Sequence, residues 1–224
     1  MDTRKVLIWE GINHPIPLGE TLAAKRNQLA NDAKAYRWDR VIEILRQNPE
    51  LVNTIRPGGK SAYTPLHQAA HGGAPVEIVE ELLRLGAWRT LRNVHGKRPF
   101  DIAQEKGYRQ LLEILEPVDC KKISFENINR MTVHFHTMIL NRYGYAEHFL
   151  LRLPPIEPLT EFDSCEMNFS LPEGFGGYTF WLDGKGDDAF LQINCWFRLG
   201  EHGLIQGWIV SPHGSLLIYE RSVH

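Results

Sequence analysis

Thr64-Pro65-Leu66-His67-Gln68-Ala69-Ala70 is the stretch that decides the fold of the first half of this chain. Thirty-four positions after Thr64 begins a similar tract, Arg98-Pro99-Phe100-Asp101-Ile102-Ala103. Each tract is followed by a glycine, Gly73 or Gly107, and then by a run with the apolar periodicity of a helix. A repeat at this period indicates stacked helical units, because one such unit cannot bury its apolar face alone.

The residues of the first tract also predict how its helix begins and ends. Thr64 is a good N-cap residue, and Pro65 suits the first helical position, where a missing N–H costs nothing. Gly73 is expected to end this short helix. A second helix should follow, because its apolar residues form one stripe: Ile78, Val79, Leu82 and Leu83.

The tract resembles the signature of the ankyrin repeat, Thr-Pro-Leu-His-x-Ala within a period of about 33 residues. The match in the 61–95 unit is close to consensus, and the resemblance covers roughly 30–117. In the last unit Arg98 stands at the Thr position and Asp101 at the His position, a departure typical of terminal repeats. The first unit is predicted as a degenerate repeat from its apolar residues: Leu29, Ala33, Val41, Ile42, Ile44 and Leu45. The resemblance thus implies about three repeats and extends to bacterial ankyrin-repeat proteins.

Beyond Pro117 the apolar pattern changes to alternating runs separated by glycine-rich turn signals, such as Asp183–Asp187 and Ser211–Gly214. This pattern predicts an antiparallel sheet of about five to seven strands, curled into a small sandwich or half-barrel. The fold class is therefore expected to be α+β. The predicted division is an N-terminal extension or cap at 1–28, ankyrin repeats at 29–117 and a β-rich domain at 118–224.

Composition limits the classes of function. The chain has 224 residues, 43% of them hydrophobic and 23% charged, with a formal net charge of −2. That charge argues against nucleic acid as a partner, because nucleic-acid binders carry a strongly basic surface. Three cysteines without framework spacing suggest reduced thiols. The chain shows no signal-peptide pattern and no apolar run of membrane-spanning length, so we expect a cytoplasmic protein, a monomer when free, without membrane association.

The loops that precede each repeat's first helix, here called fingers, are the expected partner-binding surface. Their charged residues are basic throughout, and Arg, Trp and Tyr dominate the energetics of many interfaces. We therefore predict a protein partner that is acidic on its contact face. The predicted contact residues are Arg56, Lys60, Tyr63, Trp88, Arg89, Arg92, His95 and Lys97.

The segment 124–142 fits either a strand or a helix, and the choice decides a metal hypothesis. As a strand it would pair in a hairpin and set His136 opposite His148, with His134 on the same face. Three imidazoles so placed would suit zinc. As a helix it would separate His134 from His136. We expect no metal site and no cofactor, with these three histidines as the candidates to be tested.

The sequence favours a protein-binding module without catalysis. The resemblance to bacterial ankyrin proteins, some of which are immunity factors, implies a cytosolic inhibitor that clamps and neutralises a partner such as a toxin. One alternative is a hydrolytic or metal-dependent enzyme, with its site in the β domain and the repeats recruiting substrate. The other alternative is a scaffold with several partners.

Overall fold

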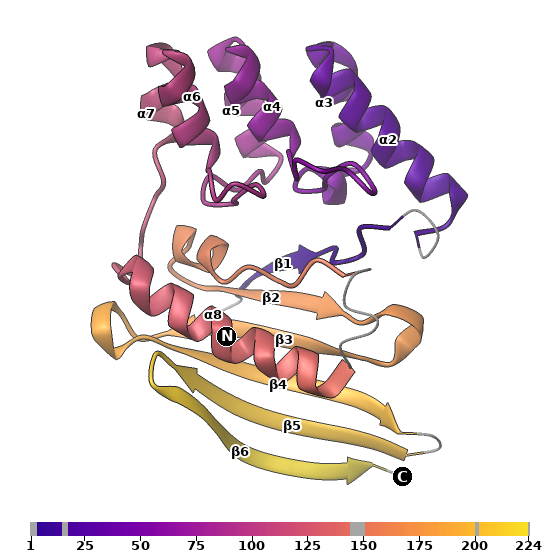
Figure 1. Ribbon diagram of the computed structural model, residues 1–224, viewed down its shortest axis with the longest axis vertical. Coiled ribbons are helices and arrows are strands. Elements are labelled where there is room, and N and C mark those ends of the chain that lie inside the picture. The colour runs from indigo at the N-terminus through magenta and orange to yellow at the C-terminus, as the bar shows by residue number, and fades with distance from the viewer. Residues whose placement is uncertain (1–3, 15–17, 144–150, 200–201, 224) are drawn as a thin grey trace. The chain divides into compact units, whose positions relative to one another are not determined.

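The computed structural model describes residues 4–14, 18–143, 151–199 and 202–223. The chain divides into two compact units (Figure 1). Residues 13–118 form the helical unit, and residues 1–12 together with 119–224 form the sheet unit. The helical unit is thus inserted, in sequence, between the first strand of the sheet unit and the rest of it.

The helical unit consists of consecutive helix pairs. Helices α2 and α3 form the first pair, α4 and α5 the second, and α6 and α7 the third. Their bounds are α2 Glu20–Lys34, α3 Trp38–Gln47, α4 Pro65–Gly72, α5 Val76–Arg84, α6 Pro99–Lys106 and α7 Leu112–Leu115, with short 3-10 turns at η1 Pro49–Leu51 and η2 Arg109–Leu111. Helix α4 packs between α2 and α6, and α5 packs between α3 and α7. The first helices of the three pairs (α2, α4 and α6) therefore form one layer, and the second helices (α3, α5 and α7) form another.

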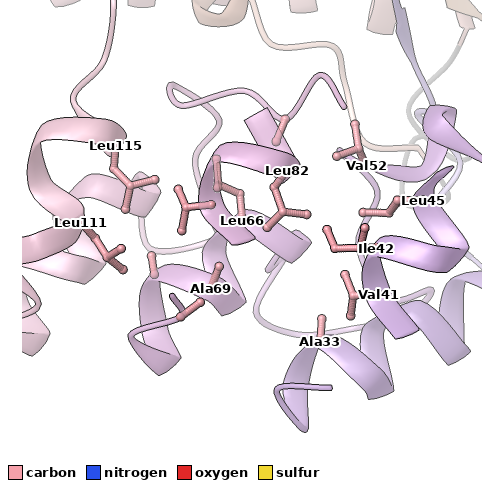
Figure 2. Close-up of a cluster of buried hydrophobic side chains, with 14 of the residues drawn as sticks. Ala33, Val41, Ile42, Leu45, Val52, Leu66, Ala69, Leu82, Leu111 and Leu115 are labelled. Carbon is pink, nitrogen blue, oxygen red and sulfur yellow. The ribbon is translucent and has the colours of Figure 1, made fainter. Parts of the chain in front are cut away.

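One continuous apolar core joins the three pairs (Figure 2). Leu45, Leu66, Leu82, Leu111 and Leu115 are all buried in it. Small residues such as Ala33 and Ala69 let the helices approach closely. In the predicted degenerate repeat, Leu29, Val41 and Ile42 are also buried, as the apolar pattern indicated. The helical unit is stabilised mainly by this shared burial, since each helix is too short to be stable alone.

The sheet unit contains, within the described residues, one six-stranded sheet in the order β1-β2-β3-β4-β5-β6. The strands are β1 Lys5–Trp9, β2 Cys165–Ser170, β3 Gly176–Asp183, β4 Phe190–Leu199, β5 His202–Ser211 and β6 Gly214–Val223. Strands β2 to β6 form an antiparallel meander, whereas β1 pairs in parallel with β2, Lys5 opposite Cys165. Short 3-10 turns occur at η4 Glu157–Glu161, η5 Pro172–Gly174 and η6 Gly186–Asp188.

Helix α8, Phe125–Tyr143, lies across one face of this sheet (Figure 1). Phe135 of α8 is fully buried, with its ring centroid 4.8 Å from that of Phe180 and 5.7 Å from that of Tyr178. Alternate residues along each strand point to this face, so β3 and β4 bury every second side chain. The core of the sheet unit therefore lies between α8 and the sheet.

The α+β class is confirmed, two details of the prediction are corrected, and the choice left open at 124–142 is decided. The described strands form one sheet covered by a helix, so the sandwich alternative is wrong. The segment 124–142 is helical, because Phe135 and its helical neighbours bury one stripe against the sheet. Residues 1–28 do not form one extension of the repeats, because β1 belongs to the sheet and α2 begins at Glu20. In the described part of the chain, no helix combines the length and apolarity of a membrane span.

Candidate partner-binding site

Buried hydrogen bonds hold the fingers in place. Thr64 Oγ1 lies 2.8 Å from His67 Nδ1, and the N–H of His67 donates to Thr64 Oγ1. The other ring nitrogen of His67, Nε2, lies 3.3 Å from the carbonyl oxygen of Lys97 in the next finger. Because this imidazole is fully buried and contacts both Thr64 and the carbonyl oxygen of Lys97, it couples the positions of the first and second fingers.

A groove opens between the first finger, which precedes α4, and the helices α2 and α4. Its cavity volume is about 480 Å³. We call it the basic groove and define it by its lining residues: Ala30, Lys34, Tyr36, Arg56, Gly59, Lys60, Ser61, Ala62, Tyr63, Gln68 and His71. The structure thus brings together Arg56, Lys60 and Tyr63 from the predicted contact set. A volume of this size admits side chains of a partner rather than a single water molecule.

The charged side chains that line the basic groove are all cationic: Lys34, Arg56 and Lys60. Arg56 Nη2 donates to Asn31 Oδ1 at 2.6 Å, which orients the guanidinium without neutralising it. No carboxylate is among the described residues that line this groove. Several cations held close together create a positive potential that attracts anionic groups.

Aromatic residues give the groove a partly apolar wall. The hydroxyl of Tyr36 lies 3.0 Å from His71 Nδ1, and the Tyr63 and His71 ring centroids are 6.0 Å apart. Burial, with the neighbouring charge of Lys106, lowers the pKa of His71 below its ordinary value. His71 is therefore neutral near pH 7 and contributes hydrogen bonding rather than charge.

The basic residues of the second finger lie outside the basic groove and have partners within the helical unit. Arg89 Nε donates to the carbonyl oxygen of Ile114, and Arg92 Nη1 donates to that of Gly96. Lys97 Nζ forms an ion pair with Glu105, at 2.6 Å from Oε1. His95 is exposed. Four residues of this finger stay predicted contacts: Arg89, Arg92, His95 and Lys97. The cations of the first finger are better placed to bind an anion, because no carboxylate is among the described residues that line their groove.

Trp88 was predicted as a surface anchor, and the structure corrects this. Its side chain is only 4% exposed, so it is a buried residue of the chain and not an exposed anchor. Its backbone N–H donates to Asn53 Oδ1, while Asn53 Nδ2 donates to the carbonyl oxygen of Gly86. Asn53 therefore joins the start of this finger to the segment that follows α3.

Sequence reasoning missed Lys34, Tyr36 and His71 as groove residues. The sequence did contain a signal for Lys34. Lys34 lies five positions after Leu29, and His71 lies five positions after Leu66, so the two residues occupy equivalent places. Aligning the degenerate first repeat on the second would have placed both side chains on the same surface.

The zinc hypothesis loses its geometric basis. His134 and His136 are two residues apart on α8, so their side chains diverge, and His136 Nε2 lies 2.9 Å from the carbonyl oxygen of Pro154. His148 lies outside the described residues. Among the residues that the structure describes, no group of three or more His, Cys, Asp or Glu side chains is placed to hold a metal.

Two thiols of the sheet unit are unsuited to nucleophilic catalysis. Burial raises the pKa of Cys165 and that of Cys195 to about 11. The thiolate is the reactive form of cysteine, so both side chains stay protonated and inert near neutral pH. They behave as small apolar core residues.

Lowering the pH is expected to destabilise the sheet unit through His136. Burial lowers the pKa of His136, although its bond to Pro154 opposes the shift. As pH falls below the ordinary histidine pKa of about 6.5, the unfolded chain binds a proton that the folded state resists, so stability falls. We expect His136→Gln, which keeps a donor toward Pro154, to show a smaller loss between about pH 7.5 and pH 5. Urea unfolding of both proteins at the two pH values measures this, and equal losses would contradict it.

Comparison with known protein families identifies one segment of the helical unit. The family model for the ankyrin repeat matches residues 62–94, which span the first finger's end, α4, α5 and the start of the second finger. Residues 62–94 are an ankyrin repeat. The ankyrin repeat is typically a protein-binding module without catalytic activity, and the basic groove lies beside this repeat. Tyr63, Gln68 and His71 of the groove belong to the matched segment.

Proposed function

We propose that this chain is a protein-binding module whose basic groove holds an acidic segment of one protein partner. The observation that carries the proposal is the lining of this groove, where Lys34, Arg56 and Lys60 converge beside Tyr36 and Tyr63. Arginine and tyrosine are the residue types that contribute most to protein interfaces. An Asp or Glu side chain can bind the cations, while its neighbours pack on the rings.

We further propose that binding neutralises the partner, as an immunity protein neutralises a toxin. The short repeat array offers a preformed surface, and its hydrogen-bonded fingers lose little conformational entropy on binding, which favours tight inhibition. The inhibitor is proposed to be a cytoplasmic monomer that pairs with its partner at one-to-one stoichiometry. Finding one tight, stoichiometric partner would separate this proposal from that of a scaffold with several partners.

Reversing two charges of the basic groove is expected to weaken binding strongly. The variant Arg56→Glu/Lys60→Glu should lose at least about tenfold in association rate at low salt, because complementary charge accelerates encounter. Its free energy of unfolding should change by no more than about 0.5 kcal/mol, as is usual for surface substitutions. Affinity capture from the native host, followed by mass spectrometry, identifies the partner; surface plasmon resonance with the purified partner then gives both rate constants.

The matched control is Arg40→Glu/Arg109→Glu, which makes the same change of charge at two exposed positions of the helical unit outside the groove. The control should capture the same partner as the native chain. The association rate of the native chain should also fall as salt rises. The association rate of the groove variant should fall less. Equal association rates for all three proteins would refute the basic groove as the binding surface.

A further inference from the structure

The helix-bearing face of the sheet is not fully filled near β5 and β6. A cavity of about 360 Å³ lies there, between α8 and strands β3 to β6. We call it the sheet-unit cavity; its lining residues are His134, Thr137, Met138, Asn141, Arg142, Tyr178, Cys195, Phe197, Gln206, Trp208 and Ser215. Its volume falls in the range of small-molecule sites, and it equals about twelve water molecules at roughly 30 Å³ each.

Aromatic rings form one side of the sheet-unit cavity. Tyr178 and Phe197 are buried neighbours on β3 and β4, with ring centroids 5.5 Å apart in an edge-to-face arrangement. Trp208 of β5 adds a third ring to the lining. Rings in fixed positions offer an apolar surface on which a flat or branched hydrocarbon group can pack.

A hydrogen-bond network positions one guanidinium at this aromatic wall. Arg142 Cζ lies 4.9 Å from the centroid of the Phe197 ring, and Arg142 Nη2 donates to Gln206 Oε1 at 2.9 Å. Trp208 Nε1 donates to the same oxygen at 3.3 Å, while Gln206 Nε2 donates to Glu220. Gln206 is only 4% exposed, so its amide is held in one orientation and in turn holds the guanidinium.

The charge balance of the lining favours an anion. Arg142 is the one permanently charged side chain among the described residues that line the cavity, and the Gln206 amide stands between it and Glu220. Burial raises the pKa of the Tyr178 hydroxyl, which keeps it protonated as a donor at neutral pH. Ser215 and Asn141 add short polar groups. The lining thus combines one cation and several hydrogen-bond donors with an apolar wall.

We infer that the sheet-unit cavity binds a small monocarboxylate with a compact apolar body, such as an aryl or branched aliphatic acid. The carboxylate accepts hydrogen bonds from the Arg142 guanidinium, and the apolar body packs on Tyr178, Phe197 and Trp208. A guanidinium matches a carboxylate in shape as well as in charge, because its parallel N–H groups can bond both oxygens. This site is independent of the proposed function, since the basic groove belongs to the other unit.

Phenylacetate and 4-methylpentanoate are the probes, and phenylacetamide is the neutral isostere. Binding to the full chain is measured by saturation-transfer NMR and by titration of tryptophan fluorescence. We expect both acids to bind, phenylacetate at least tenfold more tightly than phenylacetamide. In Arg142→Gln the preference for the acid should disappear, whereas Arg198→Gln, which makes the same charge change on the opposite face of the sheet, should retain it.

A second variant tests the site even if Arg142→Gln does not fold. Ser215→Leu keeps Arg142 and fills part of the cavity, so it should weaken binding of both probes at least tenfold. Circular dichroism and urea unfolding establish that each variant is folded. Absence of binding by both acids at about 10 mM to the native chain would overturn the inference, as would equal binding of acid and amide or undiminished binding to folded Arg142→Gln.

Discussion

Truncating Trp88 to alanine is expected to lower the free energy of unfolding of the helical unit by about 3–5 kcal/mol. The side chain is 4% exposed, so its removal leaves a cavity that the surrounding structure closes only in part. Urea unfolding followed by far-ultraviolet circular dichroism measures the loss. Under conditions where the variant stays folded, its affinity for the partner should be close to that of the native chain.

Val94→Ala provides the comparison, because Val94 lies in the same finger and is 56% exposed. Its effect on unfolding should stay within about 0.5 kcal/mol. If Trp88→Ala unfolds like the native chain but binds the partner poorly, the indole belongs to the contact surface. That result would also contradict the buried position described above.

Truncating Phe135 should have a similarly large effect on the sheet unit, a loss of about 3–5 kcal/mol. This ring is fully buried and makes edge-to-face contacts with Phe180 and Tyr178, so its loss removes both apolar burial and aromatic pairing. The measurement is urea unfolding monitored by the fluorescence of the sheet tryptophans.

Val133→Ala is the matched control on the same helix, since Val133 is 63% exposed. It should change the free energy of unfolding by no more than about 0.5 kcal/mol. If Phe135→Ala cost as little as Val133→Ala, α8 would not be packed on the sheet through Phe135.

The ankyrin repeat was predictable from sequence because its structural determinants are local. Thr64 caps its own helix and bonds to His67 three positions later, so a short tract carries the necessary information. The buried stripe of α5 follows from helical periodicity alone. Even the departures at Arg98 and Asp101 preserve the turn, since Asp101 Oδ2 accepts from the N–H of Arg98 at 2.8 Å.

The sheet unit was less predictable because distant contacts decide its structure. The segment at 124–142 fits both periodicities, and the choice of a helix rests on packing of Phe135 against residues of β3, more than forty positions later. Strand β1 was missed for the same reason. Its partner β2 lies beyond the whole helical unit in sequence, and no pattern within Lys5–Trp9 specifies that partner.

The candidate site was predicted in part. Composition of the first finger indicated Arg56, Lys60 and Tyr63, and the structure places these three around one groove. Lys34 was missed because its repeat lacks the signature tract that would have aligned it. The prediction for Trp88 is wrong because a position in a polar finger does not by itself make a large side chain exposed, and this indole is buried.

The parallel pairing of β1 with β2 has a consequence for biosynthesis. The paired residues Lys5 and Cys165 are 160 positions apart, so at about 5–20 residues per second the ribosome makes β2 about 8 to 32 seconds after β1. Meanwhile the helical unit, whose helix contacts are within and between successive helix pairs, can fold as it emerges. Throughout that interval β1 carries Leu7 and Trp9, which are buried in the finished protein, without the strand that pairs with it. Burial of these two side chains in the sheet is therefore one of the late steps in the folding of this chain.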